Sequence, residues 1–173
     1  MRLFLALTPP PELRTRFGEL ADLAQARCGG RRIPDANLHL TLAFLGEVSP
    51  TRLDSLAHRV RQLKVQADSW TLDEWGCFRS PRIVWIGGAR PDPALQRLHS
   101  TLWQELAALG FEGGPSRYIP HLTLLRRAER LDTPKLPAFR IDWPYCQVEL
   151  VHSVTGPGGS RYTTLARSRA VKG

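Results

Sequence analysis

The sequence has few cysteines and no long apolar run. Cys28, Cys77 and Cys146 are odd in number, widely separated and never spaced as CxxC, which argues against a disulfide framework and against a zinc knuckle. We expect them to be small buried hydrophobic residues in a reducing cytoplasm. The apolar stretch before the first prolines is too short for a signal-peptide core or a membrane span. We therefore expect a cytoplasmic protein without a membrane partner.

Several common catalytic motifs are also absent. The chain has no GxSxG, so it lacks the nucleophile elbow of serine hydrolases. It has no HD, HxH or HExxH grouping, and the carboxylates Glu47 and Glu129 do not have the spacing of metal ligands. We therefore expect neither a metal nor another cofactor.

Acidic residues are outnumbered by basic ones. The 173 residues contain 16 Asp and Glu against 24 Lys and Arg, which gives a formal charge of +8 and an isoelectric point near 10.2. Such a balance favours a polyanionic or phosphorylated partner, although it also serves solubility. Hydrophobic residues make up 42% of the chain, which is enough for a core and excludes a disordered basic tail protein.

One pattern of elements occurs twice along the chain. In the first copy, a strand at Arg2–Leu7 precedes an amphipathic helix and a strand at His39–Leu45. In the second copy, a strand at Arg82–Ile86 precedes a helix that Asp92 caps and a strand at His121–Leu125. This repetition predicts one bilobal domain over residues 1–173, with two pseudo-symmetric lobes that each carry one histidine strand.

Further elements are expected around this frame. The helix stripes are Leu13, Phe17, Leu20 and Ala24, then Leu53, Leu56, Val60 and Leu63, then Leu95, Leu98, Leu102, Leu106 and Leu109. Additional strands are expected at Trp70–Phe78, Phe139–Trp143, Val148–Val154 and Tyr162–Ala166. We expect a polar loop at residues 127–137, a frayed tail at 167–173, His58 and His99 at solvated or capped helix positions, and His152 in packing or at the cleft edge.

The two repeated strands begin with the same tetrapeptide, His-Leu-Thr-Leu, at residues 39–42 and 121–124. Because residues i and i+2 of a strand share a face, His39 and Thr41 point one way while the leucines point into a core. His121 and Thr123 follow the same rule. Pseudo-symmetry would bring both polar faces together across one cleft. The same alternation places Phe44 on the core face.

Two imidazoles and two hydroxyls around one centre suit phosphodiester chemistry. In-line displacement at phosphorus needs a base for the entering oxygen and an acid for the leaving oxygen, and histidine can serve as either near neutral pH. Threonine hydroxyls can donate hydrogen bonds to the non-bridging oxygens as charge develops there. This set requires no metal.

The segments NLHLTLAFLGEV at residues 37–48 and PHLTLLR at residues 120–126 resemble a known family. Two HxT motifs in a chain of this size resemble the two-histidine (2H) phosphoesterase superfamily. The extended segments more closely resemble the RNA 2',3'-cyclic phosphodiesterases, the LigT/ThpR family formerly called 2'-5' RNA ligases. The resemblance runs from residue 2 to about residue 166.

The resemblance implies a bilobal α+β fold, with two antiparallel sheets lining a central cleft and helices packed outside. It also implies metal-independent hydrolysis of 2',3'-cyclic phosphate RNA ends to 2'-phosphates, with a weak reverse ligation to a 5'-hydroxyl. By position, His39 would be the general acid and His121 the general base, with Thr41 and Thr123 as phosphate binders. The implied partner is RNA, such as tRNA fragments, and a monomer is expected.

Secondary candidates lie near the two motifs. The family also has an arginine after the second motif, but Arg126 is at an odd offset from His121, so only a bend or bulge would aim it at the cleft. Arg32 stands where the family often has a tryptophan. Phe44 or Tyr118 can stack on a terminal base if the strand end permits. The arginines that flank the motifs are candidates for RNA-backbone binding: Arg31, Arg32, Arg117, Arg126, Arg127 and Arg130.

Two other readings stay open from the sequence. One is a different 2H reaction, on a cyclic nucleotide, on an ADP-ribose cyclic phosphate or as a 3' exonuclease. The other is a binding module that holds a nucleotide or RNA end without turnover. The arginines near the motifs favour a polymer over a mononucleotide, and the paired histidines favour an enzyme over a binder.

Overall fold

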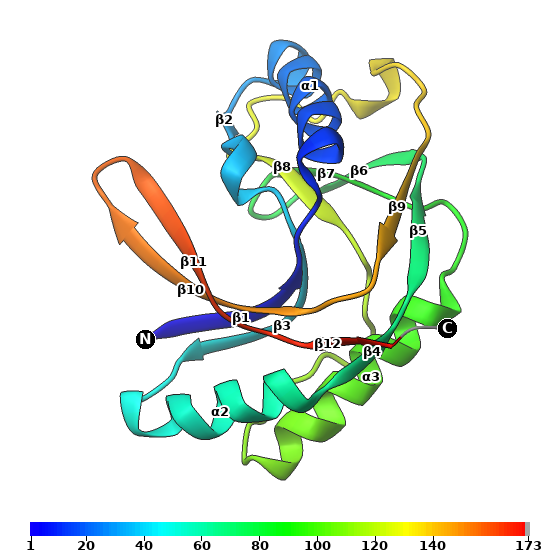
Figure 1. Ribbon diagram of the computed structural model, residues 1–173. Coiled ribbons are helices and arrows are strands. Elements are labelled where there is room, and N and C mark those ends of the chain that lie inside the picture. The colour runs from blue at the N-terminus through cyan, green and yellow to red at the C-terminus, as the bar shows by residue number, and fades with distance from the viewer. Residues whose placement is uncertain (172–173) are drawn as a thin grey trace.

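The computed structural model describes residues 1–171 as an α+β protein (Figure 1). Its helices are α1 (Pro11–Cys28), α2 (Pro50–Gln62) and α3 (Pro93–Ala108), with short 3-10 turns η1 (Asp35–Asn37) and η2 (Thr133–Lys135). Its strands are β1 (Arg2–Leu7), β2 (Arg31–Arg32), β3 (Leu40–Glu47), β4 (Lys64–Gln66), β5 (Asp68–Leu72), β6 (Glu74–Phe78), β7 (Ile83–Gly87), β8 (Leu122–Arg126), β9 (Ile141–Tyr145), β10 (Glu149–Gly156), β11 (Gly159–Arg167) and β12 (Arg169–Val171). The expected fold class is confirmed.

The main sheet has the strand order β11-β10-β1-β3-β8-β7-β6, with β2 beside β8, and its pairings are antiparallel. The strands of the two repeats therefore form two halves of one sheet. These halves join at β8, which pairs with β3 at Leu40 and Leu122 and with β2 through Arg31–Arg126 and Arg32–Leu125. Because both HxT motifs lie at this narrow junction, the join between the halves is also the place where the site forms.

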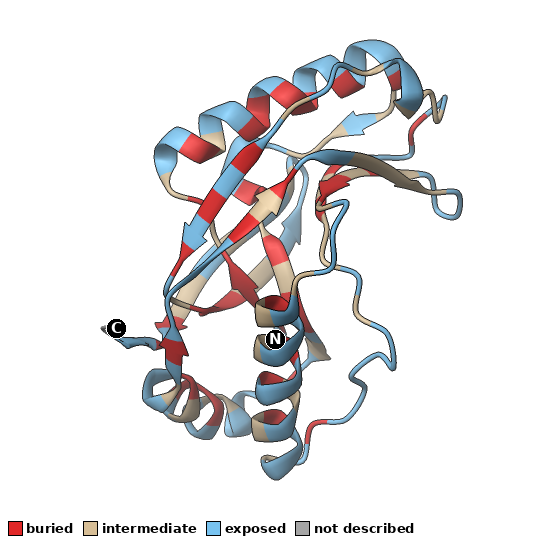
Figure 2. Cartoon of the chain, turned by 90° about the vertical axis from the view of Figure 1, so that its right-hand side faces the viewer, coloured by how far each residue is buried: buried red, intermediate tan, exposed pale blue. Residues whose placement is uncertain are grey.

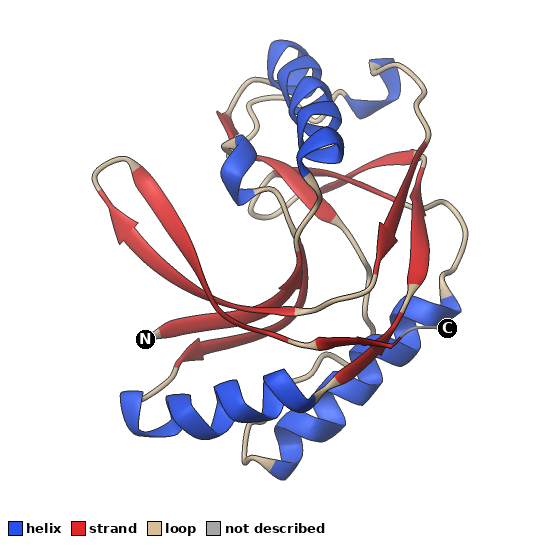
Figure 3. Cartoon of the chain, in the orientation of Figure 1, coloured by secondary structure: helices blue, strands red, loops and turns tan. Residues whose placement is uncertain are grey.

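The helices cover the sheet from two sides (Figure 3). Helix α1 packs against β8 and β2, whereas α3 packs against β3, and α2 packs against β10 and β11. Each repeat thus sends its helix to the histidine strand of the other repeat. Most buried side chains of both halves belong to one hydrophobic core, which includes Phe17, Trp70 and Trp143, while Phe4, Ala6 and Val151 form a smaller cluster.

The helix boundaries follow from local chemistry. Each helix begins with a proline in its first turn, where the missing N–H costs nothing. The Asp92 carboxylate caps α3 by accepting the Leu95 N–H at 3.0 Å. Gly29 ends α1 with φ 69°, a conformation that favours glycine. Figure 2 shows buried residues on the helix faces that meet the sheet and exposed residues on the outer faces.

Some expectations at the sheet edges were wrong. Residues 70–78 form no single strand, because the chain leaves the β5–β9 pair at Asp73 and enters the β6–β7 pair. The Asp73 carboxylate accepts the Ala89 N–H at 2.9 Å and stabilises this change of direction. The expected frayed tail forms β12, which pairs in parallel with β4, while its last two residues, 172–173, lie outside the described part.

Two side chains also differ from expectation. His99 is only 6% exposed, because the ring of Tyr118 stacks on it at 4.0 Å. Cys146 is exposed, whereas Cys28 is buried as expected. Across residues 1–171, no helix combines the length and apolar composition that crossing a membrane requires.

Candidate active site

The His39 imidazole is held at both of its nitrogens. Its Nδ1 lies 2.6 Å from the Asn37 carbonyl oxygen, and its Nε2 lies 2.7 Å from the Thr41 hydroxyl oxygen. Because a carbonyl can only accept, Nδ1 carries the proton and donates it. In the neutral ring Nε2 therefore carries no proton, and it accepts a hydrogen bond from the Thr41 hydroxyl.

His121 has the same support in the second half. Its Nδ1 donates to the carbonyl of Ile119 at 2.8 Å, again two residues earlier in the chain. The neutral ring therefore also has a bare Nε2. Two imidazoles with the same tautomer, each fixed by a backbone carbonyl, are suited to exchange protons at Nε2.

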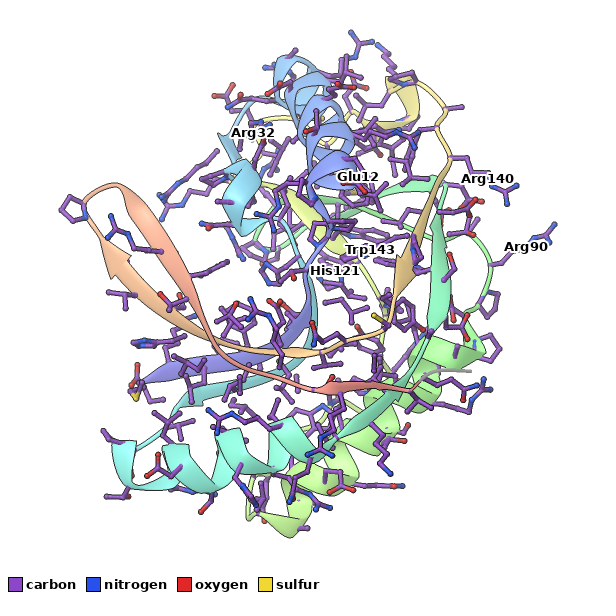
Figure 4. The ribbon with its side chains drawn as sticks, in the orientation of Figure 1. Glu12, Arg32, Arg90, His121, Arg140 and Trp143 are labelled. Carbon is purple, nitrogen blue, oxygen red and sulfur yellow. The ribbon has the colours of Figure 1, made fainter. Side chains whose placement is uncertain are left out.

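The sheet register brings the two motifs together. Leu40 and Leu122 are antiparallel partners and both are fully buried. Extending this register by one residue on each side sets His39 beside Thr123 and Thr41 beside His121. All four polar side chains are half-buried on the face opposite the leucines. Figure 4 shows His121 near the centre of the molecule, between the two halves.

A β-bulge follows each motif and changes which residues face the cleft. In β3 the register with β1 shifts between Leu5 and Ala6, so the consecutive residues Leu42 and Ala43 are both buried. In β8 the register with β7 shifts at the equivalent place, so Leu124 and Leu125 are both buried. One extra residue reverses the alternation of every residue after it.

The bulges place Phe44 and Arg126 at equivalent positions, each five residues after its histidine. Phe44 is 51% exposed and lines the cleft, so its expected place on the core face is wrong. Arg126 lines the same cleft, so the bulge that this role required is present. The guanidinium of Arg2 lies over the Phe44 ring, 5.1 Å from its centroid.

Aromatic rings support both imidazoles. Phe4 stacks on His39 with ring centroids 4.8 Å apart, and Tyr162 meets the same imidazole edge-on at 5.4 Å. Phe78 meets His121 edge-on at 5.0 Å, and Trp85 lies 5.9 Å from it. These four rings restrict the orientations of the imidazoles and exclude water from one side of each.

Burial and positive charge favour the neutral form of both histidines. The pKa of His39 is lowered to about 4, mainly by desolvation and further by the charges of Arg126 and His121, while the hydrogen bond to Asn37 opposes this shift. Desolvation and the charge of Arg126 also lower the pKa of His121, while its hydrogen bond to Ile119 opposes them. Arg126 therefore acts electrostatically on both imidazoles.

A cavity of about 250 Å³ opens beside His39 and Thr41 and extends to the hairpin formed by β10 and β11. Four arginines and no carboxylate line it: Arg2, Arg31, Arg32 and Arg126. Hydroxyl groups of the hairpin complete its wall, from Ser153, Thr155, Ser160 and Tyr162. This lining suits an anion with several oxygens.

Arg32 has a structural role that the sequence did not indicate. It forms ion pairs with Asp22 at 2.7 Å and Asp35 at 2.6 Å, and its remaining N–H groups donate to the carbonyls of Gly18 and Ile33. Burial lowers the pKa of Arg32, but the two carboxylates outweigh burial and raise it. Its charge is therefore already neutralised, although the side chain borders the cavity.

Tyr118 is not free to stack on a base. Its ring is covered by His99, and its hydroxyl donates to the Thr41 carbonyl at 2.9 Å. Sequence reasoning missed the supporting residues Asn37, Phe4 and Tyr162, because only the folded sheet brings them against His39. His152 is half-buried on β10, but it does not line the cavity, which its neighbour Ser153 does.

The model of the 2'-5' RNA ligase superfamily matches residues 9–154, which include both motifs. The chain belongs to this superfamily. Within residues 1–171, no three His, Cys, Asp or Glu side chains gather where they could hold a metal ion.

Individual members of the superfamily are similar over nearly the whole chain. An RNA 2',3'-cyclic phosphodiesterase of Escherichia coli is 36% identical over 169 residues, covering 96% of this chain and 94% of that protein. One of Thermotoga maritima is 30% identical and covers 95% and 93%. The structure of E. coli LigT complexed with 3'-AMP has a TM-score of 0.81 and 34% identity, covering 96% of this chain and 95% of that one.

Proposed function

We propose that this protein hydrolyses the 2',3'-cyclic phosphate at the 3' end of RNA to a 2'-phosphate. The observation that carries the proposal is the pair of imidazoles at the junction of the two half-sheets, each with Nδ1 fixed by a carbonyl and with an Nε2 that carries no proton in the neutral ring. The names of the relatives support the substrate, and LigT structures with 3'-AMP and with phosphate support a nucleotide site.

The reaction uses one histidine on each side of the phosphorus. His121 Nε2 accepts a proton from water as the water oxygen bonds to phosphorus. The bond between phosphorus and the 3'-oxygen breaks, and His39 donates a proton to that oxygen. The products are a 2'-phosphate and a 3'-hydroxyl, and a later proton exchange with solvent restores both rings.

These roles follow the resemblance of the two motifs to the family, and the charges of the site are compatible with them. The lowered pKa of His121 keeps it neutral and basic near pH 7. His39 must be protonated to act as the acid, and the negative charge of a bound phosphodiester raises the pKa of an adjacent imidazole. Thr41 and Thr123 donate hydrogen bonds to the non-bridging oxygens, and Arg126 supplies a positive charge that acts on both histidines.

The same step accepts an RNA 5'-hydroxyl in place of water. His121 would then deprotonate the 5'-oxygen, and the product would be a 2'-5' linkage. Water is present at far higher concentration than any RNA end, so hydrolysis dominates. The proposal further includes a metal-free reaction, action as a monomer in the cytoplasm, and tRNA fragments among the RNA substrates.

The test uses a short RNA that ends in a 2',3'-cyclic phosphate, with and without EDTA. We expect conversion to a 2'-phosphate that EDTA does not change and that His39→Ala and His121→Ala abolish. His58→Ala is the matched control, because His58 is exposed on α2 and does not line the cavity, and it should retain full activity.

Three results would contradict parts of the proposal. No turnover by the unaltered protein would indicate an RNA-end binding module. Loss of activity with EDTA would exclude the metal-free mechanism. Faster hydrolysis of a cyclic nucleotide or an ADP-ribose cyclic phosphate than of any RNA would assign a different 2H reaction.

A further inference from the structure

Two arginines stand directly opposite each other at one end of the cavity. Arg31 of β2 and Arg126 of β8 are antiparallel partners, so their side chains share a face of the sheet. Like charges at such positions destabilise a strand pair. The arrangement is explained if the site binds anions, because two bound negative charges would offset the repulsion between the two guanidinium groups.

The neighbouring arginine shows the contrast. Arg32 follows Arg31 in β2, but Asp22 and Asp35 neutralise its charge. Within residues 1–171, neither Arg31 nor Arg126 has a carboxylate within ion-pair distance. The two-residue strand therefore separates one arginine that stabilises the fold from one whose charge is available in the cavity.

The β10–β11 hairpin lies against Arg31. A Cβ atom built on Gly159 would lie 2.8 Å from the Arg31 Nη2, which shows that the guanidinium lies against the turn of the hairpin. The Asn37 side-chain amide donates to the Ser160 carbonyl at 2.9 Å and holds the hairpin against the segment that leads to His39. Hydroxyl groups of Thr155 and Ser160 line the same cavity beside Arg31.

We propose that Arg31 and these hairpin hydroxyls form a second phosphate subsite, which binds the phosphodiester preceding the terminal nucleotide. The inference rests on the proposed function and specifies its substrate class. Arg126 faces the reacting phosphate beside the histidines, and Arg31 faces the next phosphate along the strand. The substrate is therefore an RNA oligonucleotide with a charged internal linkage, and a 2',3'-cyclic mononucleotide is a poor substitute.

Three substrates separate the contribution of the internal phosphate charge from that of the terminal nucleotide. They are a 2',3'-cyclic mononucleotide, a dinucleotide ending in a 2',3'-cyclic phosphate, and the same dinucleotide with a neutral methylphosphonate as its internal linkage. For the unaltered protein, we expect kcat/KM on the charged dinucleotide to exceed the other two by about tenfold or more, mostly through KM, as one lost charge-assisted contact would give.

Arg31→Gln tests the residue itself. It should lower kcat/KM on the charged dinucleotide at least fivefold more than on the mononucleotide, and Arg31→Lys should restore part of the loss. Arg90→Gln is the control, because Arg90 points outward on the side of the molecule away from the hairpin (Figure 4). The slope of log kcat/KM against log salt on the charged dinucleotide should become shallower by about 0.7 in Arg31→Gln.

The outcomes are distinct. Equal kcat/KM on all three substrates would overturn the second phosphate subsite while leaving the proposed hydrolysis in place. Equal losses on mononucleotide and dinucleotide in Arg31→Gln would also overturn it, because Arg31 would then act at the reacting phosphate. Absence of turnover on every substrate would overturn the proposed function, and with it the subsite.

Discussion

The Tyr118 hydroxyl donates a hydrogen bond to the backbone carbonyl of Thr41, with 2.9 Å between the oxygens. Tyr118 lies three residues before His121, so one side chain joins the approach to the second motif to the strand of the first. Its ring stacks on the buried His99 of α3, and burial raises the pKa of its phenol. The hydroxyl is therefore a permanent donor, and the two motifs are mechanically coupled through it.

Tyr118→Phe should keep the ring stacked on His99 while removing this coupling. We expect a loss of about 1 kcal/mol in the free energy of unfolding, typical of one hydrogen bond, and a several-fold lower kcat with little change in KM. Urea denaturation and steady-state kinetics measure the two effects. A normal kcat despite reduced stability would show that the hydrogen bond serves folding alone.

The stability of the protein should depend on pH through His39. Its pKa is about 4 in the folded protein and near 6.5 when unfolded. Between these values the unfolded chain binds more protons, so stability is highest above pH 6.5 and falls as the pH drops toward 4. We expect a loss of about 1–2 kcal/mol from His39 between pH 7 and pH 5.

Denaturation of His39→Gln across the same pH range isolates this contribution, because glutamine does not titrate. The variant should lose less stability on acidification than the unaltered protein. Identical pH profiles for the two proteins would contradict the lowered pKa. An NMR titration of the imidazole should also show the pKa rise when phosphate binds.

Substitutions of Arg126 and Arg32, which both line the cavity, should affect different properties: activity for Arg126 and stability for Arg32. Arg126→Ala should lower kcat/KM by about 10²–10³, as loss of one group that stabilises a transition-state charge does, with little change in stability. It should also raise the pKa of His39 and His121, because Arg126 lowers both. Kinetics and NMR titration test both effects, and unchanged histidine pKa values would place Arg126 farther from the imidazoles.

Arg32→Ala is the counterpart. It removes two ion pairs and two backbone contacts that join α1, β2 and η1, so the expected effect is on stability. Thermal denaturation should show a lower midpoint while kcat/KM stays within a few-fold of normal. A loss of activity equal to that of Arg126→Ala, at normal stability, would instead assign Arg32 to substrate binding.

The Trp85 ring, which contacts His121, packs directly over Gly76 and leaves no space for a side chain there. A Cβ atom at this position would lie 2.3 Å from the Trp85 ring, and Trp85 lies against His121. Gly76→Ala should therefore cost about 1–3 kcal/mol of stability, as overpacking does, and should lower kcat by displacing the imidazole. Gly158→Ala, where a Cβ meets nothing within 4 Å, is the matched control, and equal behaviour of the two variants would contradict the argument.

The sequence predicted the helices and the alternating burial within the two HxT motifs well because their signals are local. Proline and Asp92 mark helix starts, Gly29 marks an end, and a periodic apolar stripe identifies the buried face of each helix. The His-Leu-Thr-Leu alternation likewise needs only the period of a strand. These features depend on neighbours within a few residues.

The sequence predicted the faces of Phe44 and Arg126 poorly, because each depends on a bulge that only strand pairing reveals. A signal was present in both segments: Leu42-Ala43 and Leu124-Leu125 interrupt the alternation with two consecutive apolar residues. The ion pairs of Arg32 and the pairing of β12 with β4 join residues whose proximity no local pattern encodes.

Because the helix of each repeat covers the histidine strand of the other, the chain cannot be cleaved into two independently folded halves. Strand β3 is covered by α3 from the other half, and β8 is covered by α1. A cut in the turn between β6 and β7 would therefore give two fragments that each present an uncovered histidine strand and a helix without its partner. The architecture corresponds to a domain-swapped dimer whose two subunits are fused. Its fragments should reassociate into one complementing pair, and neither should fold as an independent half.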